Sequence, residues 1–428
     1  MNNTPNKLSS PISSRLRIAL VTETYPPEVN GVAMTLGKLV TGMQAKGHRV
    51  QVVRPNQARE VANAPGSGAD YEADEVLVRG LPIPGYGDMR FGFPCGQRLA
   101  RLWNTRRPDV VHVATEGPLG WSAVATARAM GLPVTSSFHT NFDSYSQHYH
   151  LGLFKAAIEG YLRYLHNRTQ ATLVPTHAML QALQARGYQN LGLMPRGVAL
   201  AQFSPARRSE ALRAHWGVGP QDLVVLHVGR LAREKNVDTL LAAFAALQQP
   251  HPGTKLVLVG DGPLRAALGA RCPHAIFTGN RTGVDLAESY ASSDLFLFPS
   301  LTETYGNVVP EALASGLAVV SYNRASAAQI ITHRHNGVLV PEPWNPMNPT
   351  RDSPARPGMD ERFIAATTAL ASDAQRLNAL RQHAPASVAH LAWSNVIDAF
   401  EATLRGVIER ASDSLSHRSH ERLAHAQP

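Results

Sequence analysis

The sequence predicts an α/β protein built from two successive, doubly wound Rossmann-like domains. Short apolar runs alternate with segments of helical periodicity along most of the 428 residues, a pattern typical of parallel sheets covered by helices. The pattern begins near Arg17 and begins again after Pro205, and the length is ample for two or three domains. Ligands of such sheets bind beyond the carboxyl ends of the strands, so two facing domains would share a cleft.

The first domain, residues 15–198, is expected to alternate buried strands with helices. Its first apolar run is followed by the loop Glu23–Gly31 and by an amphipathic helix over about residues 32–47. Residues 60–75 are polar and acidic, which favours a surface loop. The predicted strands are Arg17–Thr22, Arg49–Val53, Asp109–Val113, Pro133–Ser137 and Ala171–Val174.

The second domain, residues 199–385, repeats the pattern. Residues 341–358 within it are rich in Pro, Asn and Arg and lack apolar periodicity, which indicates an irregular insertion. Residues 386–411 form a helix that is expected to pack back toward the first domain, and the polar ends, 1–14 and 412–428, are expected to be disordered. The predicted elements are a helix over Asp238–Gln248 and strands over Asp222–Val228, Lys255–Val259, Ala275–Thr278, Asp294–Phe298 and Leu317–Ser321.

The charge is unevenly distributed along the chain. Residues 1–196 carry 20 Lys and Arg against 12 Asp and Glu, whereas residues 197–428 carry 21 against 20, within a net charge of +9. A basic surface of this kind favours an anionic membrane, with ordinary solvated charge as the alternative explanation. Nucleic-acid binding is not expected, because the basic residues lack an interleaved platform of aromatic side chains.

The cysteine content and the N-terminal sequence indicate in which cellular compartment the protein works. Cys95 and Cys272 are too few for a disulfide framework or a cysteine-based zinc site, which fits a reducing environment. The first 14 residues lack the apolar core of a signal peptide, and no run is long enough to span a bilayer. We expect a cytoplasmic protein, with peripheral attachment to the inner face of the cytoplasmic membrane as an option. The oligomeric state is left open.

The segment Glu303–Glu311 places two carboxylates on either side of a Gly-Asn step, after an apolar run that ends at Ser300. It predicts a strand, a turn and a short helix over about Val308–Ser315, with both carboxylates facing one crevice. The N–H groups that begin this helix favour an anion such as phosphate. An ionised carboxylate only accepts hydrogen bonds, so the pair suits hydroxyl groups. A ligand that carries diols beside a phosphate is typically a sugar nucleotide.

Two cations follow the first strand of the second domain. Gly229 lets the backbone turn, and Arg230 and Lys235 place positive charge at the mouth of the cleft, where a diphosphate leaving group would need both. A solvated helix start is the alternative. The turn at Gly260–Pro263 lacks the third glycine of a dinucleotide fingerprint and is interpreted as structural.

The first domain offers two further candidates. Gly31 lies at a helix start and could offer N–H groups to a phosphate, while Asn30 could cap the same helix. His139 follows a strand at the edge where sites form, although a lone histidine is as often structural. His148 and His150 lie nearby without a carboxylate cluster, so no metal site and no bound cofactor are expected.

These motifs resemble those of the retaining glycosyltransferases of family 4, which have the two-domain GT-B fold. Glu303 and Glu311 fit the E-x7-E signature of that family, and the resemblance covers about residues 17–340. The first-domain motifs are similar to those of its lipid-directed mannosyl-, glucosyl- and sulfoquinovosyltransferases. They are Val29–Val32, Leu81–Tyr86, His112–Pro118 and Phe138–Asn141.

The resemblance implies a division of labour between the domains. The second would bind a nucleoside-diphosphate sugar, either GDP-mannose or a UDP-hexose, and the first would bind the acceptor, either a membrane lipid or a soluble carbohydrate. The catalytic residues that it implies are His139, Glu303, Arg230 and Lys235. Glu311 would hold the ribose. The other donor-binding residues that it implies are Gly31, Gly229, Asn280, Arg281, Tyr305, Gly306 and Asn307.

The chain departs from the family pattern at Ala199, where Asp is frequent, and at the insertion over residues 341–358. Metal-independent transfer with retention is expected to occur on one face of the sugar, because no side chain can be nominated as a nucleophile on the other face. A polysaccharide or other soluble acceptor, a sugar-nucleotide epimerase and a non-catalytic nucleotide-binding protein are the alternatives. A dehydrogenase is disfavoured because no intact G-x-G-x-x-G is present.

Overall fold

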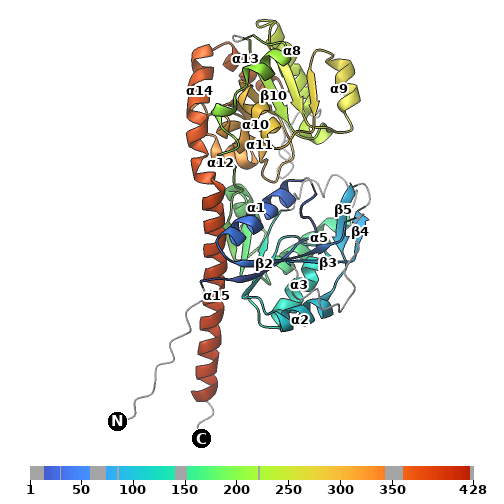
Figure 1. The fold of residues 1–428 in the computed structure, drawn as a ribbon, viewed down its shortest axis with the longest axis vertical. Helices are drawn as coiled ribbons and strands as arrows, with labels where there is room; N and C mark the ends of the chain where they lie inside the picture. Colours follow the sequence, from blue (N-terminus) through green and yellow to red (C-terminus); the bar gives the residue numbers. More distant parts are fainter. Residues whose placement is uncertain are drawn as a thin grey trace, which may run out of the picture.

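The computed structural model describes residues 14–28, 30–57, 74–83, 86–139, 152–219, 222–342 and 360–424. Within these residues the chain forms two domains stacked along the long axis of the molecule, with a long C-terminal helix beside them (Figure 1). Each domain is built on a parallel sheet with helices packed against it. The predicted α/β fold with two doubly wound domains is confirmed.

The N-terminal sheet contains β1 (Arg17–Val21), β2 (Arg49–Pro55), β3 (Glu75–Val78), β6 (Val110–Val113), β7 (Val134–Ser137), β8 (Ala171–Val174) and β9 (Leu191–Leu193). Its strand order is β3-β2-β1-β6-β7-β8-β9, and neighbouring strands are parallel. Because the chain runs outward from β1 to β3 and then returns to β6, the order reverses between β1 and β6. A reversal of this kind is where such sheets bind ligands.

The helices of this domain are α1 (Gly31–Ala45), α2 (Gly96–Thr105), α3 (Pro118–Ala129), α5 (Gly152–His166) and α6 (His177–Ala185). A hairpin of β4 (Gly80–Ile83) and β5 (Tyr86–Gly92) accompanies them. Side chains of α1 pack on one face of the sheet with Leu20 and Val52, while α2 and α3 pack on the other face with Val21 and Val111. Burial on both faces of β1 explains why its last four residues, Ile18–Val21, form a continuous apolar run.

The C-terminal sheet contains β10 (Val224–Val228), β11 (Lys255–Val259), β12 (Ile276–Gly279), β13 (Leu295–Phe298), β14 (Ala318–Tyr322) and β15 (Val338–Val340). Its strand order is β12-β11-β10-β13-β14-β15, and neighbouring strands are parallel. The order reverses between β10 and β13. Phe296 and Phe298 face one core cluster, and Leu295 and Leu297 face the other.

The helices of the C-terminal domain are α7 (Glu210–His215), α8 (Val237–Gln248), α9 (Arg265–Arg271), α10 (Gly283–Ala291), α11 (Val308–Ala314), α12 (Ala325–Ile330), α13 (Glu361–Ala371) and α14 (Ala374–Ser387). Short 3-10 turns complete it at η2 (Pro205–Arg207), η3 (Arg233–Lys235) and η4 (Ala389–Leu391). The helices α8 and α13 cover one face of the sheet, and α10 and α11 cover the other.

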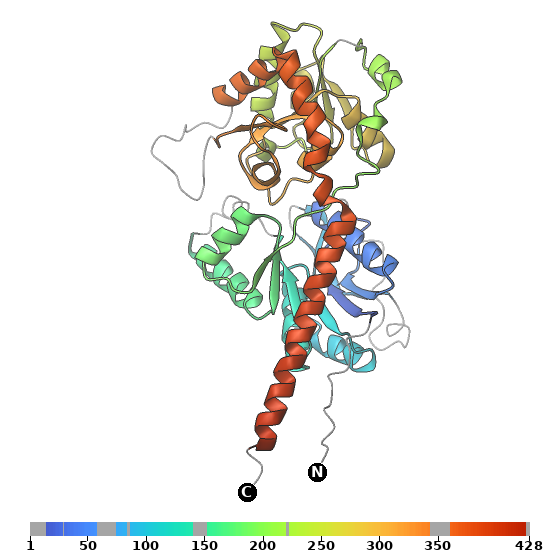
Figure 2. The same cartoon turned by 90° about the vertical axis from the view of Figure 1, so that its left-hand side faces the viewer.

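The final helix, α15 (Trp393–Ala424), differs from the prediction at both ends. It begins at Trp393, after η4, and continues to Ala424 through residues that the sequence analysis expected to be disordered. The first half of α15 runs beside α1 of the N-terminal domain (Figure 2), and side chains of both helices belong to one core cluster, so this half of the helix is anchored. Extending an anchored helix costs less than starting one, and residues 412–424 contain no Pro or Gly to stop it.

The strands β3, β9 and β15 and the hairpin of β4 and β5 were missed by the sequence analysis. They are short or lie at sheet edges, where pairing partners rather than apolar pattern decide the structure. Of the loop expected over residues 60–75, residues 60–73 lie outside the described residues, and β3 begins at Glu75. Residues 1–13, 343–359 and 425–428, where disordered ends and the insertion were expected, also lie outside the described residues.

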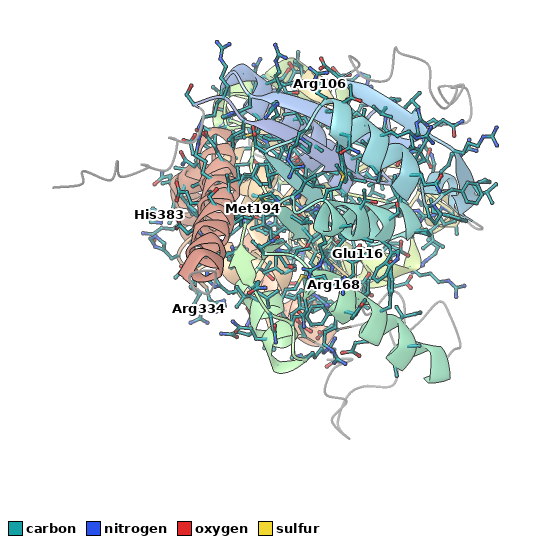
Figure 3. The ribbon with its side chains drawn as sticks, turned by 90° about the horizontal axis from the view of Figure 1, so that it is seen from below. Arg106, Glu116, Arg168, Met194, Arg334 and His383 are labelled. Atoms are coloured by element: carbon teal, nitrogen blue, oxygen red, sulfur yellow. The ribbon has the colours of Figure 1, made fainter. Side chains whose placement is uncertain are left out.

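Two chain crossings between the domains lie side by side. The first follows β9, where Met194 packs with residues of α15 (Figure 3). The second joins α14 to α15. The N–H of Val198 in the first crossing donates to the carbonyl of Leu391 in the second at 2.8 Å, and Gly197 lies against the ring of Trp393. The domains are therefore joined through one compact double connection.

Candidate active site

The candidate residues of the C-terminal domain gather where its strand order reverses. Lys235 follows β10 through η3, and Glu303 follows β13. Their side chains form an ion pair that is 18% and 12% exposed, respectively, and the hydroxyl of Ser300 donates to the same carboxylate at 2.8 Å. Lys235 also lies 5.9 Å from the ring centroid of Phe298. Two of the proposed catalytic residues thus touch each other at the carboxyl ends of adjacent strands.

Glu311 lies further along, on α11. Its carboxylate accepts a hydrogen bond of 3.0 Å from the Tyr290 hydroxyl on α10. Burial raises the pKa of Glu311 to about 7, and the bond from Tyr290 opposes this only in part. The two carboxylates of the motif therefore have different surroundings, because Glu303 faces a cation and Glu311 faces a phenol.

The turn between these carboxylates is shaped by Gly306, whose φ of +83° favours glycine. The hydroxyl of Ser326 donates to the Gly306 carbonyl at 2.9 Å, and the N–H of Ser326 donates to the Tyr305 carbonyl at 2.9 Å. Asn307 follows, and its side-chain oxygen is buried without a hydrogen-bond partner among the described residues. The turn is thus held from α12 and leaves one amide group available to a ligand.

Arg230 lies apart from the ion pair. Its side chain is 57% exposed and is 3.8 Å from Glu234. Gly229 before it has a φ of +153°, and a Cβ on the adjacent Gly260 would fall 2.0 Å from its carbonyl oxygen. The two glycines let neighbouring turns approach closely, and the Arg230 side chain beside them remains exposed.

Asn280 and Arg281 follow β12, the edge strand of the sheet, and both are exposed. Arg281 is 3.6 Å from Asp285 in a surface ion pair. Two strands separate β12 from β13, so the structure does not bring these residues into contact with Glu303. A ligand that contacts both Glu303 and these two residues would have to extend across the ends of the intervening strands.

The N-terminal domain contributes Gly31, the first residue of α1. Asn30 caps this helix, and its side-chain oxygen accepts from the N–H groups of Val32 and Ala33 at 3.0 and 2.9 Å. A Cβ on Gly31 would lie 2.9 Å from Nη1 of Arg196 and 3.6 Å from Nδ2 of Asn307. The helix start of one domain therefore directly meets the turn of the other.

His139 follows β7 and lies at the same meeting point. Its carbonyl accepts a hydrogen bond of 3.4 Å from the hydroxyl of Thr304, the residue after Glu303. Both ring nitrogens are buried and have no hydrogen-bond partner among the described residues. Burial holds the pKa of His139 well below its usual value, and the nearby Arg196 acts in the same direction, so the ring is neutral.

Arg196 is a residue that the sequence analysis missed. It lies on the crossing after β9, it is 6% exposed, and its backbone carbonyl accepts from the Tyr305 hydroxyl at 3.3 Å. No motif marks it, because it belongs to the connection between the two units. A signal was present in the sequence, since an arginine in a connecting segment followed by Gly197 and Val198 has no surface helix to belong to.

The assembled group suits an anionic ligand that also carries hydroxyl groups. Arg196, Lys235 and the start of α1 provide positive charge, whereas Glu303 and Glu311 provide acceptors. Among the described residues, no group of three or more His, Cys, Asp or Glu side chains could hold a metal ion. His148 and His150 lie outside the described residues. In the same part of the chain, no helix has the length and apolar character needed to cross a membrane.

Comparisons with known proteins agree with this geometry. A family model described as Glycosyltransferase Family 4 matches residues 29–202, and one described as Glycosyl transferases group 1 matches residues 222–347. The chain is 35% identical over 332 residues to a GDP-mannose-dependent alpha-mannosyltransferase of Mycobacterium tuberculosis, covering 76% of this chain and 84% of that protein.

Two further matches extend the comparison. The chain is 30% identical over 341 residues to the sulfoquinovosyl transferase SQD2 of Arabidopsis thaliana, covering 78% of this chain and 64% of that protein. The solved structure of sucrose-phosphate synthase from Thermosynechococcus elongatus has a TM-score of 0.70 at 17% identity, covering 92% of this chain and 100% of that chain. The second likeness concerns the fold alone.

Proposed function

The chain belongs to glycosyltransferase family 4 and has the GT-B fold, and from this premise we propose that it transfers a hexose from a nucleoside-diphosphate sugar to a membrane lipid. We propose further that the transfer retains the anomeric configuration and needs no metal ion. The observation that carries the proposal is the partly buried pair of Lys235 and Glu303 at the carboxyl ends of the two central strands, with Glu311 further along. A cation beside two hydroxyl acceptors is what a sugar diphosphate requires.

The donor that we favour is GDP-mannose. The support comes from the Mycobacterium tuberculosis relative, which is named as a GDP-mannose-dependent alpha-mannosyltransferase. A UDP-hexose is the second candidate. In either case Glu311 accepts hydrogen bonds from the ribose hydroxyls, and Glu303 faces the sugar that moves. Asn280 and Arg281, at the edge of the sheet, frame the base.

Lys235 and Arg230 stabilise the diphosphate as it leaves, assisted by backbone N–H groups of residues 305–307 and of Gly31. Preorganised charge at the atom where charge develops lowers the barrier of such a step. Lys235 is already held by Glu303, and Arg230 is free to turn inward from its exposed position. Gly229 leaves room for the phosphates.

The transfer takes place on one face of the sugar. The bond between C1 and the β-phosphate oxygen breaks, and its electron pair stays on that oxygen. The acceptor hydroxyl oxygen forms the new bond to C1 on the same face, and its proton passes to a phosphate oxygen. His139 is neutral, so it offers the sugar a hydrogen bond without repelling the cationic groups nearby.

The acceptor that we favour is a lipid at an anionic membrane surface, and the protein acts from the cytoplasm. The sulfoquinovosyl transferase of Arabidopsis thaliana and an alpha-monoglucosyldiacylglycerol synthase of Streptococcus pneumoniae are among the relatives, at 30% and 27% identity. The excess of basic residues in the first half of the chain attracts the protein to such an anionic surface.

The proposal is tested by melting the protein with GDP, UDP, ADP, GDP-mannose and UDP-glucose, and then by analysing products with membrane lipids. We expect one nucleoside diphosphate and its sugar to raise the melting temperature and to yield a glycolipid. The Glu311→Ala variant should lose the shift. A wild-type protein that no nucleotide stabilises would contradict the proposal, and a product formed without any acceptor would indicate an epimerase instead.

A further inference from the structure

The Arg196 side chain is a buried cation that lacks hydrogen-bond partners. It is 6% exposed, its Nε is buried without an acceptor, and no hydrogen bond joins its guanidinium to another described residue. Its Cζ lies 5.9 Å from the ring centroid of Tyr305, at the limit of a cation–π contact. Removing a charge from water without a partner is costly, so such a residue needs an explanation.

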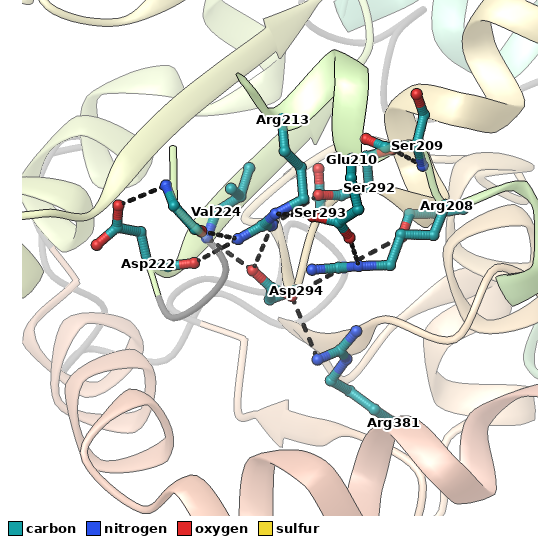
Figure 4. A network of polar contacts seen from close by, with 12 residues as sticks. Arg208, Ser209, Glu210, Arg213, Asp222, Val224, Ser292, Ser293, Asp294 and Arg381 are labelled. Atoms are coloured by element: carbon teal, nitrogen blue, oxygen red, sulfur yellow. Dashed lines mark hydrogen bonds and ion pairs between the residues drawn. The ribbon is translucent and has the colours of Figure 1, made fainter. Parts of the chain in front are cut away.

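A buried arginine with a structural role looks different in this protein. Arg213 is also fully buried, yet it donates to the Asp294 carboxylate at 3.1 Å and to the carbonyls of Ser292, Gly219 and Asp222 at 2.7–2.9 Å (Figure 4). Its charge and most of its donors are thus satisfied. Arg196 is nearly as buried without that network, which indicates that its partner does not lie among the described residues.

The surroundings of Arg196 show what kind of partner is missing. Its Nη1 lies against Gly31, at the positive end of the 15-residue helix α1. The acid that influences it, Glu303, is already paired with Lys235. Burial lowers the pKa of Arg196 to about 10, which leaves the guanidinium charged at neutral pH. A second positive element, with no free carboxylate beside it among the described residues, calls for an anion.

We propose that Arg196 is a further donor-binding residue, which grips the diphosphate of the sugar nucleotide from the crossing between the two domains. The proposal rests on the proposed function. The guanidinium matches two phosphate oxygens with parallel N–H groups. Its neighbours Gly31 and Asn307 come from opposite domains, so the ligand is held at the point where the domains meet.

The test measures the binding of GDP, GMP and guanosine to the full chain and to three variants. Binding is measured directly by calorimetry, or by the ability of GMP or guanosine to displace bound GDP. Arg196→Gln removes the charge, and Arg196→Lys keeps the charge without the fork. Arg168→Gln is the matched control, because Arg168 precedes β8 and lies at the amino-terminal ends of the strands, whereas Arg196 follows β9 at their carboxyl ends (Figure 3). Arg196→Gln should weaken GDP binding about 10- to 100-fold, the loss expected for a hydrogen bond to a charged group, with little change for guanosine.

Arg196→Lys should lie between the wild type and Arg196→Gln for GDP, and Arg168→Gln should match the wild type. Equal weakening of GDP and guanosine, or an unchanged affinity for GDP, would overturn the role. If Arg196→Gln does not fold, Arg196→Lys decides by the same comparison of GDP with guanosine. A wild-type protein that binds no nucleoside diphosphate would instead refute the proposed function itself, for which UDP is the second probe.

Discussion

Lys235 and Glu303 neutralise each other where water has little access, so neither side chain can be removed without leaving the other charge buried. The pair also fixes where the cation stands. Lys235 is joined to a loop that follows β10, and Glu303 to a loop that follows β13, so the ion pair holds the two loops in register. Because its position is fixed in this way, we assign Lys235 the role of stabilising the departing diphosphate.

Replacing Lys235 with Ala should lower kcat by about 10²–10³-fold, the usual cost of one preorganised electrostatic contact. The measurement is turnover of the sugar nucleotide once the donor is identified. Lys38→Ala is the control, because Lys38 is exposed on α1. Near-normal turnover of Lys235→Ala would show that Lys235 takes no part in the mechanism. It would not contradict the family assignment.

Glu311 gives donor binding a predictable dependence on pH. Burial raises its pKa from 4.5 to about 7, so the free protein holds this proton at mildly acidic pH. Ribose hydroxyls donate best to the ionised carboxylate, so binding of GDP-mannose should tighten as pH rises through 7 and should release a proton. Calorimetry in buffers of different ionisation enthalpy measures that proton. Glu311→Gln should bind more weakly and lose the dependence.

The same proton affects stability with the opposite sign. The unfolded chain loses it at a pKa near 4.5, and the folded chain loses it near 7. The contribution to the free energy of unfolding is therefore full below 4.5 and is lost as pH rises through 7. Glu23→Gln is the control, because burial raises the pKa of Glu23 to about 7 as well, yet its carboxylate lies at the N–H of Leu119. It should change stability in the same window and leave proton release on donor binding intact.

Among the elements, α15 carries the clearest prediction. Phe400 is 1% exposed in the core of the N-terminal domain, and its ring lies 4.9 Å from that of His112. Phe400→Ala should lower the free energy of unfolding by about 3–5 kcal/mol, measured by chemical denaturation. Arg410→Ala, at an exposed position of the same helix, should leave stability nearly unchanged. An equal loss in both variants would mean that α15 contributes through helix formation alone.

A second prediction concerns the network at the start of β13. Asp294 accepts ion pairs from Arg208, Arg213 and Arg381, which come from three separate elements or loops. Asp294→Ala should cost about 3–5 kcal/mol of unfolding free energy, because it removes the buried acidic partner of the fully buried Arg213 and leaves only the exposed Glu210 at 3.8 Å. Asp285→Ala, at an exposed ion pair, is the control and should cost little.

The elements also show how far sequence reasoning reaches. Central strands such as β1 and β13 were predicted because burial on both faces forces continuous apolar residues, and this holds whatever the neighbours are. The edge strand β9 was missed, since its three residues, Leu191–Leu193, depend on pairing with β8. Glu303 and Lys235 were predicted from adjacent loops, whereas their direct ion pair was not, because it depends on how the two loops lie in space.

At the scale of the whole molecule, both sheets reverse their strand order between inner strands, and the carboxyl-terminal edges of the sheets, which lead to Gly31 and Asn307, are the ones that meet. The N-terminal reversal lies between β1 and β6, and the C-terminal one between β10 and β13. Gly31, Arg196 and Asn307 touch where these edges approach each other. The site therefore depends on how the two domains meet, and the hydrogen bond between Val198 and Leu391 links the two crossings that join them. No motif in either half encodes how the domains meet, which is why Arg196 was missed although its place in a connecting segment was visible in the sequence.

The distribution of charge over the whole molecule predicts how it meets a membrane. On the N-terminal domain, Tyr161 and Tyr164 are 37% and 52% exposed, and Trp121 stacks on Tyr164 at 5.5 Å. Arg168 lies over the same ring at 5.0 Å. Aromatic rings beside a basic residue suit the boundary between lipid headgroups and acyl chains. We propose that this aromatic patch is where the basic half of the chain contacts lipid.

We expect the protein to float with anionic phosphatidylglycerol vesicles at low salt and to be released by about 0.5 M salt, because exposed charges are screened within a few ångströms there. The Tyr164→Ser/Arg168→Gln double variant should float less and still bind the donor, since both residues lie away from Lys235 and Glu303. Arg334→Gln, at an exposed position of the C-terminal domain, is the matched control. Absence of wild-type flotation at low salt, or equal flotation with neutral vesicles, would argue against electrostatic attachment. Lipid would then have to reach the site from solution, and a soluble acceptor would become the better candidate.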